Sequence, residues 1–144
     1  MPNIANPNHN ILFQNISDDL TKADVSQWEL PEFEVYEFNP KATKYCFVAI
    51  TWNEGDRIKS QLKRMKMNSH LADIIIADGD SNDGSTEHRF LKGQGVRTLL
   101  VTKEIGLCTA TRMALNYALM QGYQGIVTVD GKKGRRGQIF CLQV

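Results

Sequence analysis

The feature that most constrains the fold is a regular alternation of apolar runs with amphipathic segments, which begins at Tyr45. The runs are short and rich in β-branched residues, as in 74–76, which is typical of strands buried on both faces. The predicted strands are 45–51, 73–77, 96–101 and 125–129, and the predicted helices are 54–67, 87–92 and 108–121. This order predicts an α/β fold with a mainly parallel sheet and helices on both faces.

The remaining segments differ from this regular part. At 144 residues the chain has the length of one domain with a substantial core. Residues 1–44 are predicted to be an irregular N-terminal extension, with a short helix over 17–30 and at most an edge strand over 33–38. The α/β domain is predicted to span 45–131. The final segment, 132–144, has a basic run interleaved with glycine: Lys132, Lys133, Arg135 and Arg136.

Composition excludes several classes of protein. The formal net charge is +1, so nothing indicates a global attraction to nucleic acid or to acidic membranes. Cys46, Cys108 and Cys141 have neither metal-ligand spacing nor an even number, which indicates reduced thiols. No apolar run is long enough for a transmembrane helix, and 1–15 lacks the pattern of a signal peptide. We therefore expect a cytoplasmic protein, with peripheral attachment to a membrane as the alternative.

Polar residues follow each predicted strand of the sheet. They are Asn53 and Glu54 after the first, Asp78 to Asp83 after the second, Lys103 after the third and Asp130 after the fourth. Parallel strands that are joined by right-handed crossovers end at one edge of the sheet, where α/β proteins bind their ligands. The sequence therefore predicts one polar site that is assembled from four separate loops.

The acidic stretch after the second strand resembles the start of an EF-hand loop, because Asp78, Asp80 and Asn82 stand at alternate positions. The sixth and twelfth positions hold Asp83 and Arg89 instead of glycine and glutamate, so a calcium loop is disfavoured. A carboxylate one position past a strand can instead accept hydrogen bonds from a ribose or a base, which is the role predicted for Asp78. For Asp80 and Asn82 turn formation is the favoured interpretation, and Asp83 is predicted to cap the next helix.

Asp130 and two cations complete the set of candidates. A carboxylate at Asp130 would suit Mg²⁺ or Mn²⁺ bridging a diphosphate, because hard cations take few protein oxygens and complete their shell with phosphate and water. Lys103 and Arg112 are candidates for phosphate contacts, although each is also explained as a solvated side chain. Asn53 and Glu54 are explained as well by capping the first helix as by contact with a base. The glycine-rich dinucleotide motif and the P-loop motif are both absent.

Four blocks, in order, resemble the family-2 glycosyltransferases of GT-A fold, closest to the dolichyl or polyprenyl phosphate sugar transferase type. The blocks are Phe47-Val-Ala-Ile-Thr-Trp-Asn-Glu54, Ile74-Ile-Ile-Ala-Asp-Gly-Asp-Ser-Asn-Asp-Gly-Ser85, Ala110-Thr-Arg-Met-Ala-Leu-Asn-Tyr-Ala-Leu119 and Ile126-Val-Thr-Val-Asp130. The resemblance covers about residues 45–131, the Rossmann-like nucleotide-binding half of such a fold. It implies a nucleotide-diphosphate-sugar donor, and inverting transfer of the sugar to a polyprenyl phosphate or saccharide acceptor.

The resemblance also implies roles for individual residues. Thr51, Asn53 and Glu54 match the loop that contacts the nucleotide, and Asp78 matches the aspartate that holds the base or ribose. Asp80, in the same loop, is grouped with the nucleotide-binding candidates. Asp130 matches the first aspartate of the metal-binding motif, which implies Mg²⁺ or Mn²⁺ as cofactor.

The sequence departs from the family pattern in three places. Ile50 replaces a common proline, and Asp78-Gly79-Asp80-Ser81 replaces Asp-Asp-Gly-Ser. After Asp130 no second metal-binding aspartate follows, and the acceptor half with its catalytic base is missing. A solvated tail and a shift of the reading frame both remain open as explanations of 132–144. An inactive nucleotide-binding fragment, or an interaction module completed by a partner chain, is therefore the alternative to an active enzyme.

Overall fold

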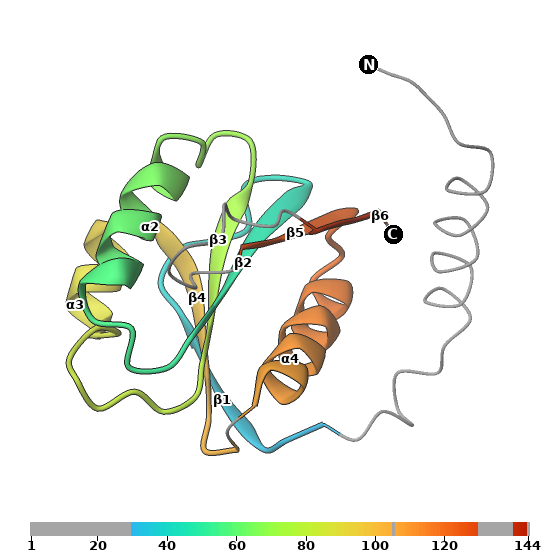
Figure 1. Cartoon of the computed structure of the whole chain (residues 1–144). Helices are drawn as coiled ribbons and strands as arrows, with labels where there is room; N and C mark the ends of the chain where they lie inside the picture. The colour runs from blue at the N-terminus through green and yellow to red at the C-terminus, as the bar shows by residue number, and fades with distance from the viewer. Residues whose placement is uncertain (1–29, 105, 130–139, 144) are drawn as a thin grey trace.

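The computed structural model describes residues 30–104, 106–129 and 140–143. Within them the chain forms a three-layer α/β arrangement, in which helices cover both faces of one sheet (Figure 1). The strands are β1 (Phe33–Glu37), β2 (Tyr45–Thr51), β3 (Asp73–Asp78), β4 (Val96–Thr102), β5 (Gly125–Val129) and β6 (Phe140–Gln143). The helices are α2 (Asp56–Lys66), α3 (His88–Gly93) and α4 (Leu107–Met120). The α/β prediction is confirmed.

The sheet has six strands in the order β1-β4-β3-β2-β5-β6. The four inner strands are parallel to one another, and β1 and β6 pair antiparallel at the two edges. Successive inner strands β2, β3 and β4 are added in one direction, whereas β5 lies on the other side of β2. The direction of winding therefore reverses between β2 and β5, and this is the point where open α/β sheets commonly bind ligands.

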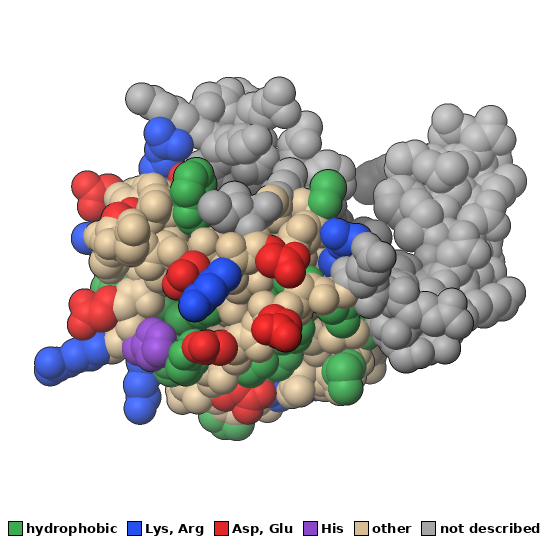
Figure 2. Space-filling view, turned by 90° about the horizontal axis from the view of Figure 1, so that it is seen from below, with side chains coloured by type: hydrophobic (Ala, Val, Ile, Leu, Met, Phe, Trp, Pro, Cys, Tyr) green, Lys and Arg blue, Asp and Glu red, His purple; other side chains and the backbone are tan. Residues whose placement is uncertain are grey.

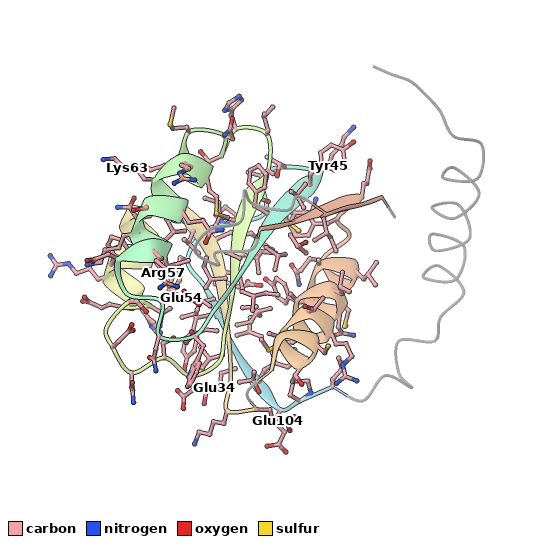
Figure 3. All side chains as sticks on the ribbon, in the orientation of Figure 1. Glu34, Tyr45, Glu54, Arg57, Lys63 and Glu104 are labelled. Carbon is pink, nitrogen blue, oxygen red and sulfur yellow. The ribbon has the colours of Figure 1, made fainter. Side chains whose placement is uncertain are left out.

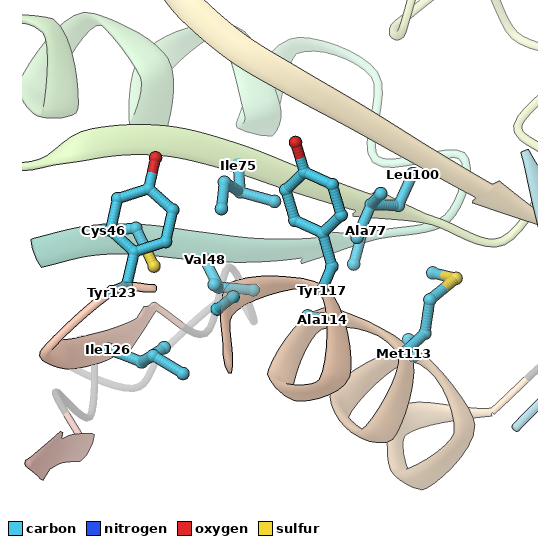
Figure 4. Packing of buried hydrophobic residues seen from close by; sticks show 12 residues of the cluster. Cys46, Val48, Ile75, Ala77, Leu100, Met113, Ala114, Tyr117, Tyr123 and Ile126 are labelled. Carbon is cyan, nitrogen blue, oxygen red and sulfur yellow. The ribbon is translucent and has the colours of Figure 1, made fainter. Parts of the chain in front are cut away.

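Two separate apolar cores follow from this winding. On one face α4 packs its buried residues against β2, β3 and β4, with Val48, Ile75 and Leu100 at the centre (Figure 4). On the other face Ile58 and Leu62 of α2 and Leu91 of α3 cover the opposite side of the same strands. Every residue of β3 is buried, which explains its uninterrupted apolar run. Each such aliphatic side chain contributes about 1.5–3 kcal/mol of burial free energy.

The predicted elements agree with the observed ones to within two residues. The largest difference is at α2, which begins at Asp56 instead of Glu54 because Gly55 has a φ of 54° and interrupts the helical conformation. The predicted edge strand over 33–38 is β1, which pairs with β4 and so belongs to the main sheet. β6 was not predicted. The sheet thus includes residues on both sides of the segment 45–131, while the predicted helix over 17–30 lies almost entirely outside the described residues.

Within the part of the chain that the structure describes, no helix is long and apolar enough to span a membrane.

Candidate functional site

The polar residues that follow the inner strands lie at one end of the molecule. Thr51 at the end of β2 pairs in register with Asp78 at the end of β3, and Val129 of β5 pairs with Ala49 of β2. Figure 2 shows this end, where acidic side chains gather on the surface. Glu34 and Glu104 are labelled at the same end in Figure 3. The loops that follow β2, β3 and β4 therefore lie at one end of the sheet, whereas the residue predicted to follow β5, Asp130, is outside the described residues.

Asp78 is buried at this edge, with only 1% of its surface exposed. Its Oδ2 accepts hydrogen bonds from the Ser81 amide at 2.9 Å and from the Thr86 hydroxyl at 3.3 Å, and its Oδ1 accepts one from the Ser81 hydroxyl at 2.6 Å. Burial raises the pKa of the Asp78 carboxyl, while the hydrogen bonds from Ser81 and Thr86 oppose that rise. The carboxylate therefore organises its own loop, and a ligand would share it with these donors.

Ser81 connects the Asp78 loop to the loop after β2. Its hydroxyl donates to Asp78 and accepts a hydrogen bond from the Asn53 amide at 2.8 Å. The side-chain oxygen of Asn53 accepts from the Asn82 amide at 2.9 Å, and the Gly79 amide donates to the Thr51 carbonyl at 3.0 Å. Asn53 has a φ of 48°, an uncommon conformation that these bonds hold in place. The two loops therefore form one connected unit.

Asp83 was predicted to cap the following helix, and this prediction is wrong. Its Oδ1 accepts from the amide and hydroxyl of Ser85, and its Oδ2 accepts from the Gly55 amide at 3.0 Å. Glu87 occupies the N-cap position of α3, and no side-chain capping hydrogen bond is present there. The hydrogen bonds from Ser85 lower the pKa of the Asp83 carboxyl. Asp83 thus adds another tie between the two loops.

Asn53 and Glu54 were also considered as caps of the first helix, and the structure does not place them in that role. Gly55 is the N-cap of α2, and no side chain caps this helix. The Glu54 side chain is partly exposed, and its Oε2 forms an ion pair with Nη1 of Arg57 at 3.6 Å. Asp80 is exposed at the tip of its loop with a φ of 63°. Both carboxylates therefore remain within reach of a ligand at this edge.

The Thr51 hydroxyl is the most unusual polar group of the site. The residue is 2% exposed, and its Oγ1 has no hydrogen-bond partner within the described part of the chain. Alternation along β2 places its side chain on the α2 face, and its partner in register, Asp78, is on that face too. A buried hydroxyl without a partner costs about 1–3 kcal/mol, so such groups call for an explanation.

Trp52 was missed as a candidate by the sequence reasoning. It follows Thr51 directly, and half of its surface (51%) is exposed. A Cβ placed on Gly79 would lie 3.4 Å from the Trp52 ring, so the Trp52 side chain lies close to the backbone of the Asp78 loop at this glycine. An exposed aromatic ring beside a polar loop is suited to stacking on a base. The position of a tryptophan directly after a buried strand was the available signal.

The two predicted phosphate contacts are placed apart from this centre. Lys103 is exposed just past the end of β4, at the same end of the molecule but one strand further away. Arg112 is exposed on α4, which covers the opposite face of the sheet from Thr51 and Asp78. Neither forms an ion pair among the described residues. Their roles in phosphate binding stay predictions.

Asp130, the predicted metal ligand, lies outside the described residues. Across the parts of the chain that are described, no group of three or more His, Cys, Asp or Glu side chains is arranged to hold a metal ion. The edge does carry carboxylate oxygens, which are the ligand type that Mg²⁺ and Mn²⁺ prefer.

No family model matches the chain, and no curated protein or solved structure is found to be similar to it. Function therefore has to be inferred from the residues and geometry of the chain itself.

Proposed function

We propose that this domain is the Rossmann-like, nucleotide-binding half of a family-2 glycosyltransferase of GT-A fold. The observation that carries the proposal is the buried Thr51 hydroxyl, which has no hydrogen-bond partner in the described part of the chain. Thr51 lies in register with Asp78 and directly before the exposed ring of Trp52. A hydroxyl, a carboxylate and an aromatic face are the groups that together recognise a nucleoside. They lie at the C-terminal ends of parallel strands, next to the point where the winding reverses.

The proposed roles follow from the position of each group. Trp52 would stack on the base, and Thr51 and Asp78 would hydrogen-bond the nucleoside. Asn53 holds the two loops in register, while the partly exposed Glu54 and the exposed Asp80 are additional candidates for polar contacts at the rim. Ser81 and Asn82 act indirectly, because their hydrogen bonds hold the Asn53 loop in place.

Charge at this edge supports a requirement for a divalent cation. The exposed carboxylates around the site would repel a bare diphosphate, and hard oxygen ligands of this kind suit Mg²⁺ or Mn²⁺. Asp130 would hold the ion, and a bound ion would offset the negative charge that develops on the departing diphosphate. Lys103 and Arg112 would add positive charge for the phosphates.

The reaction proposed is inverting transfer of a sugar from a nucleoside diphosphate to an acceptor. A polyprenyl phosphate or a saccharide is the acceptor class that the sequence resemblance implies. No catalytic base is assigned among the described residues.

Tryptophan fluorescence provides the direct test. The chain has two tryptophans, so a Trp28→Phe protein retains Trp52 as its single reporter. We expect titration with UDP, GDP or ADP in the presence of Mg²⁺ to change the Trp52 emission with one of these nucleotides, because a stacked base covers the ring. If no nucleoside diphosphate binds at millimolar concentration with Mg²⁺ or Mn²⁺ present, the proposal fails.

A Thr51→Val variant sharpens this test. It removes the hydroxyl at nearly constant volume, and since that hydroxyl has no partner among the described residues, we expect unchanged or slightly raised stability. Nucleotide affinity should nevertheless fall about tenfold, because the ligand loses a hydrogen bond in a buried site. Equal affinity in both proteins would contradict the role given to Thr51.

Activity assays separate an enzyme from a binding fragment. Incubation with nucleotide sugars, a polyprenyl phosphate and Mn²⁺ should yield transferred sugar or hydrolysed donor if the chain is active. Binding without either product would indicate a nucleotide-binding fragment that lacks its acceptor half, and absence of nucleotide binding would favour an interaction module.

A further inference from the structure

The exposed side of α2 carries a concentration of positive charge that the balanced composition conceals. Five of its eleven residues are basic and one is acidic. The basic residues are Arg57, Lys59, Lys63, Arg64 and Lys66. By contrast, the fourteen residues of α4 include Arg112 as their one charged side chain. Of the two longest described helices, α2 therefore carries nearly all of the positive charge, although the net charge of the chain is only +1.

Helix geometry spreads these cations over the whole outer surface of α2. Ile58, Leu62 and Met65 are buried against the sheet, so the remaining positions face outward. Residues 59, 63 and 66 are four and three apart and form a stripe on the flank next to α3, where Lys59 lies over the Phe90 ring and Lys66 donates to the Gly93 carbonyl at 3.3 Å. Residues 57 and 64, two turns apart, occupy the other flank.

Most of this charge is not neutralised locally. The two ion pairs of the helix, Arg57 with Glu54 and Lys59 with Asp56, are both in its first turn. In the last two turns, neither Lys63 nor Arg64 has an acidic partner among the described residues, and Lys66 contacts a carbonyl. Figure 3 shows Lys63 pointing away from the sheet. The uncompensated positive charge is thus concentrated at the C-terminal end of α2.

Apolar side chains protrude beside this charge. Met67 follows α2 directly and is 77% exposed, and Leu71 in the same turn region is 57% exposed. Lys92 of α3 is exposed close by, since Lys66 contacts the carbonyl of the adjoining Gly93. Two large aliphatic side chains among four cations form a surface that suits the boundary between lipid headgroups and acyl chains.

We propose that the α2 surface, defined as Lys63, Arg64, Lys66, Met67, Leu71 and Lys92, docks on an anionic lipid bilayer. Cations there would attract the headgroups, and Met67 and Leu71 would insert between them. A nucleic acid would satisfy the charge but would leave both aliphatic side chains against phosphate and water, so the bilayer is the better match. The surface is at the opposite end of the strands from Thr51, and docking leaves the candidate nucleotide site accessible. The inference is independent of the proposed function.

Vesicle co-sedimentation of the full chain tests the proposal. We expect binding to vesicles of phosphatidylcholine with roughly 30% phosphatidylserine, little binding to pure phosphatidylcholine, and release as salt screens the charges. Neutralising Lys63, Arg64 and Lys66 to Gln should weaken binding on the order of a hundredfold, since each cation near an anionic surface contributes about a fivefold effect. Far-UV circular dichroism verifies that the variant is folded.

A matched control carries the same change in net charge elsewhere. Neutralising Lys41, Lys44 and Arg89 to Gln removes three exposed cations outside the α2 surface and should weaken binding by less than threefold. A Met67→Ser, Leu71→Ser protein tests insertion separately, and should lower vesicle binding while it leaves any affinity for single-stranded RNA unchanged.

The basic segment near the C-terminus is tested with a separate variant, because its charge alone would attract anionic lipid. A protein with Lys132, Lys133, Arg135 and Arg136 neutralised to Gln should retain most of its vesicle binding. The proposal is overturned if that protein loses binding while the α2 variant keeps it, if the two triple variants bind alike, or if the full chain binds RNA but not vesicles.

Discussion

The strand β3 has an aspartate at each end, and the two are used in opposite ways. Asp73 begins the strand and Asp78 ends it, and both are buried. Asp73 accepts hydrogen bonds from the Ala42 and Thr43 amides at 3.1 and 3.3 Å, and from the Tyr123 hydroxyl at 2.7 Å. All three donors come from segments about 30 to 50 residues away in sequence. The partners of Asp78, in contrast, lie within eight residues of it.

The surroundings of the two carboxylates differ in the same way. Tyr123 also accepts from Arg97, a 5% exposed guanidinium that donates to Tyr117 at 3.2 Å and to Gln121 at 2.9 Å. Burial raises the pKa of the Tyr117 hydroxyl to about 12, with a further rise from its hydrogen bond to Glu37. This network ties β1, β3, β4 and α4 together. The Asp78 network ties two surface loops, so one end of β3 is a structural junction and the other is a candidate site.

The largest expected effect is a difference in stability between variants of Asp73 and Asp78. Asp73→Ala leaves two amides and the Tyr123 hydroxyl without an acceptor in a buried setting, and should lower the free energy of unfolding by about 3 kcal/mol. Asp78→Ala should cost only about 1 kcal/mol, because the donors on Ser81 and Thr86 are near the surface and can bind water. Urea denaturation measures both. Equal losses would show that the comparison is wrong.

A smaller effect is expected from Ser81→Ala, which removes the hydroxyl between Asp78 and Asn53. We expect a loss of about 1 kcal/mol and faster hydrogen exchange at the Asn53 amide, whose acceptor is gone. Ser60→Ala, on the exposed side of α2, is the control and should be neutral or slightly stabilising because alanine favours helices. Unchanged protection of the Asn53 amide would contradict the proposed connection between the loops.

The smallest effect concerns pH. Burial raises the pKa of Asp78, so its contribution to stability is fully present below the ordinary carboxyl pKa of about 4 and is lost as pH rises through the raised value. The stability of the unmodified chain relative to Asp78→Asn should therefore fall as pH rises through this range. Thermal melts of both proteins in a series of buffers from below the ordinary carboxyl pKa to neutral pH measure this change in relative stability.

Asp83→Asn provides the opposite slope for comparison. Hydrogen bonds from Ser85 lower the pKa of Asp83, so its contribution is present above the ordinary carboxyl pKa and is lost as pH falls through the lowered value. Relative to Asp83→Asn, the unmodified chain should lose stability on acidification. Two slopes of the same sign would refute the different environments that we assign to these neighbouring aspartates.

Most of the fold was predictable because its signals are local. The β-branched runs fixed the inner strands, and the predicted edge strand was found as β1. β6 was missed because residues 140–143 have no alternating pattern that distinguishes them from the basic tail, and their pairing with β5 depends on the rest of the sheet. Asp73 was assigned only as the start of a strand, since nothing near it indicates Tyr123 or Thr43 as partners.

The candidate site was predictable in position but not in detail. The order of strands and loops predicted that Asn53 and Asp78 lie at one edge, whereas Thr51 was a candidate through the family resemblance alone. In the structure Thr51 pairs in register with Asp78, and the Asn53 amide donates to Ser81 of the Asp78 loop. The exposure of Trp52, the burial of Asp78 and the use of Asp83 to hold Gly55 depend on how two loops 28 residues apart meet.

The sequence by itself determined the alternation of elements, the parallel inner sheet and the edge at which polar residues gather, because β-branched runs and helical spacing act over a few residues. Only the tertiary structure decided that Asp73 joins distant segments of the fold and that Asp78 borders the candidate site. A buried carboxylate is defined by the donors that reach it, and for Asp73 those donors come from distant segments. The basic surface of α2 is intermediate: helical periodicity predicts its cations, whereas packing against the sheet and α3 decides that they face outward together.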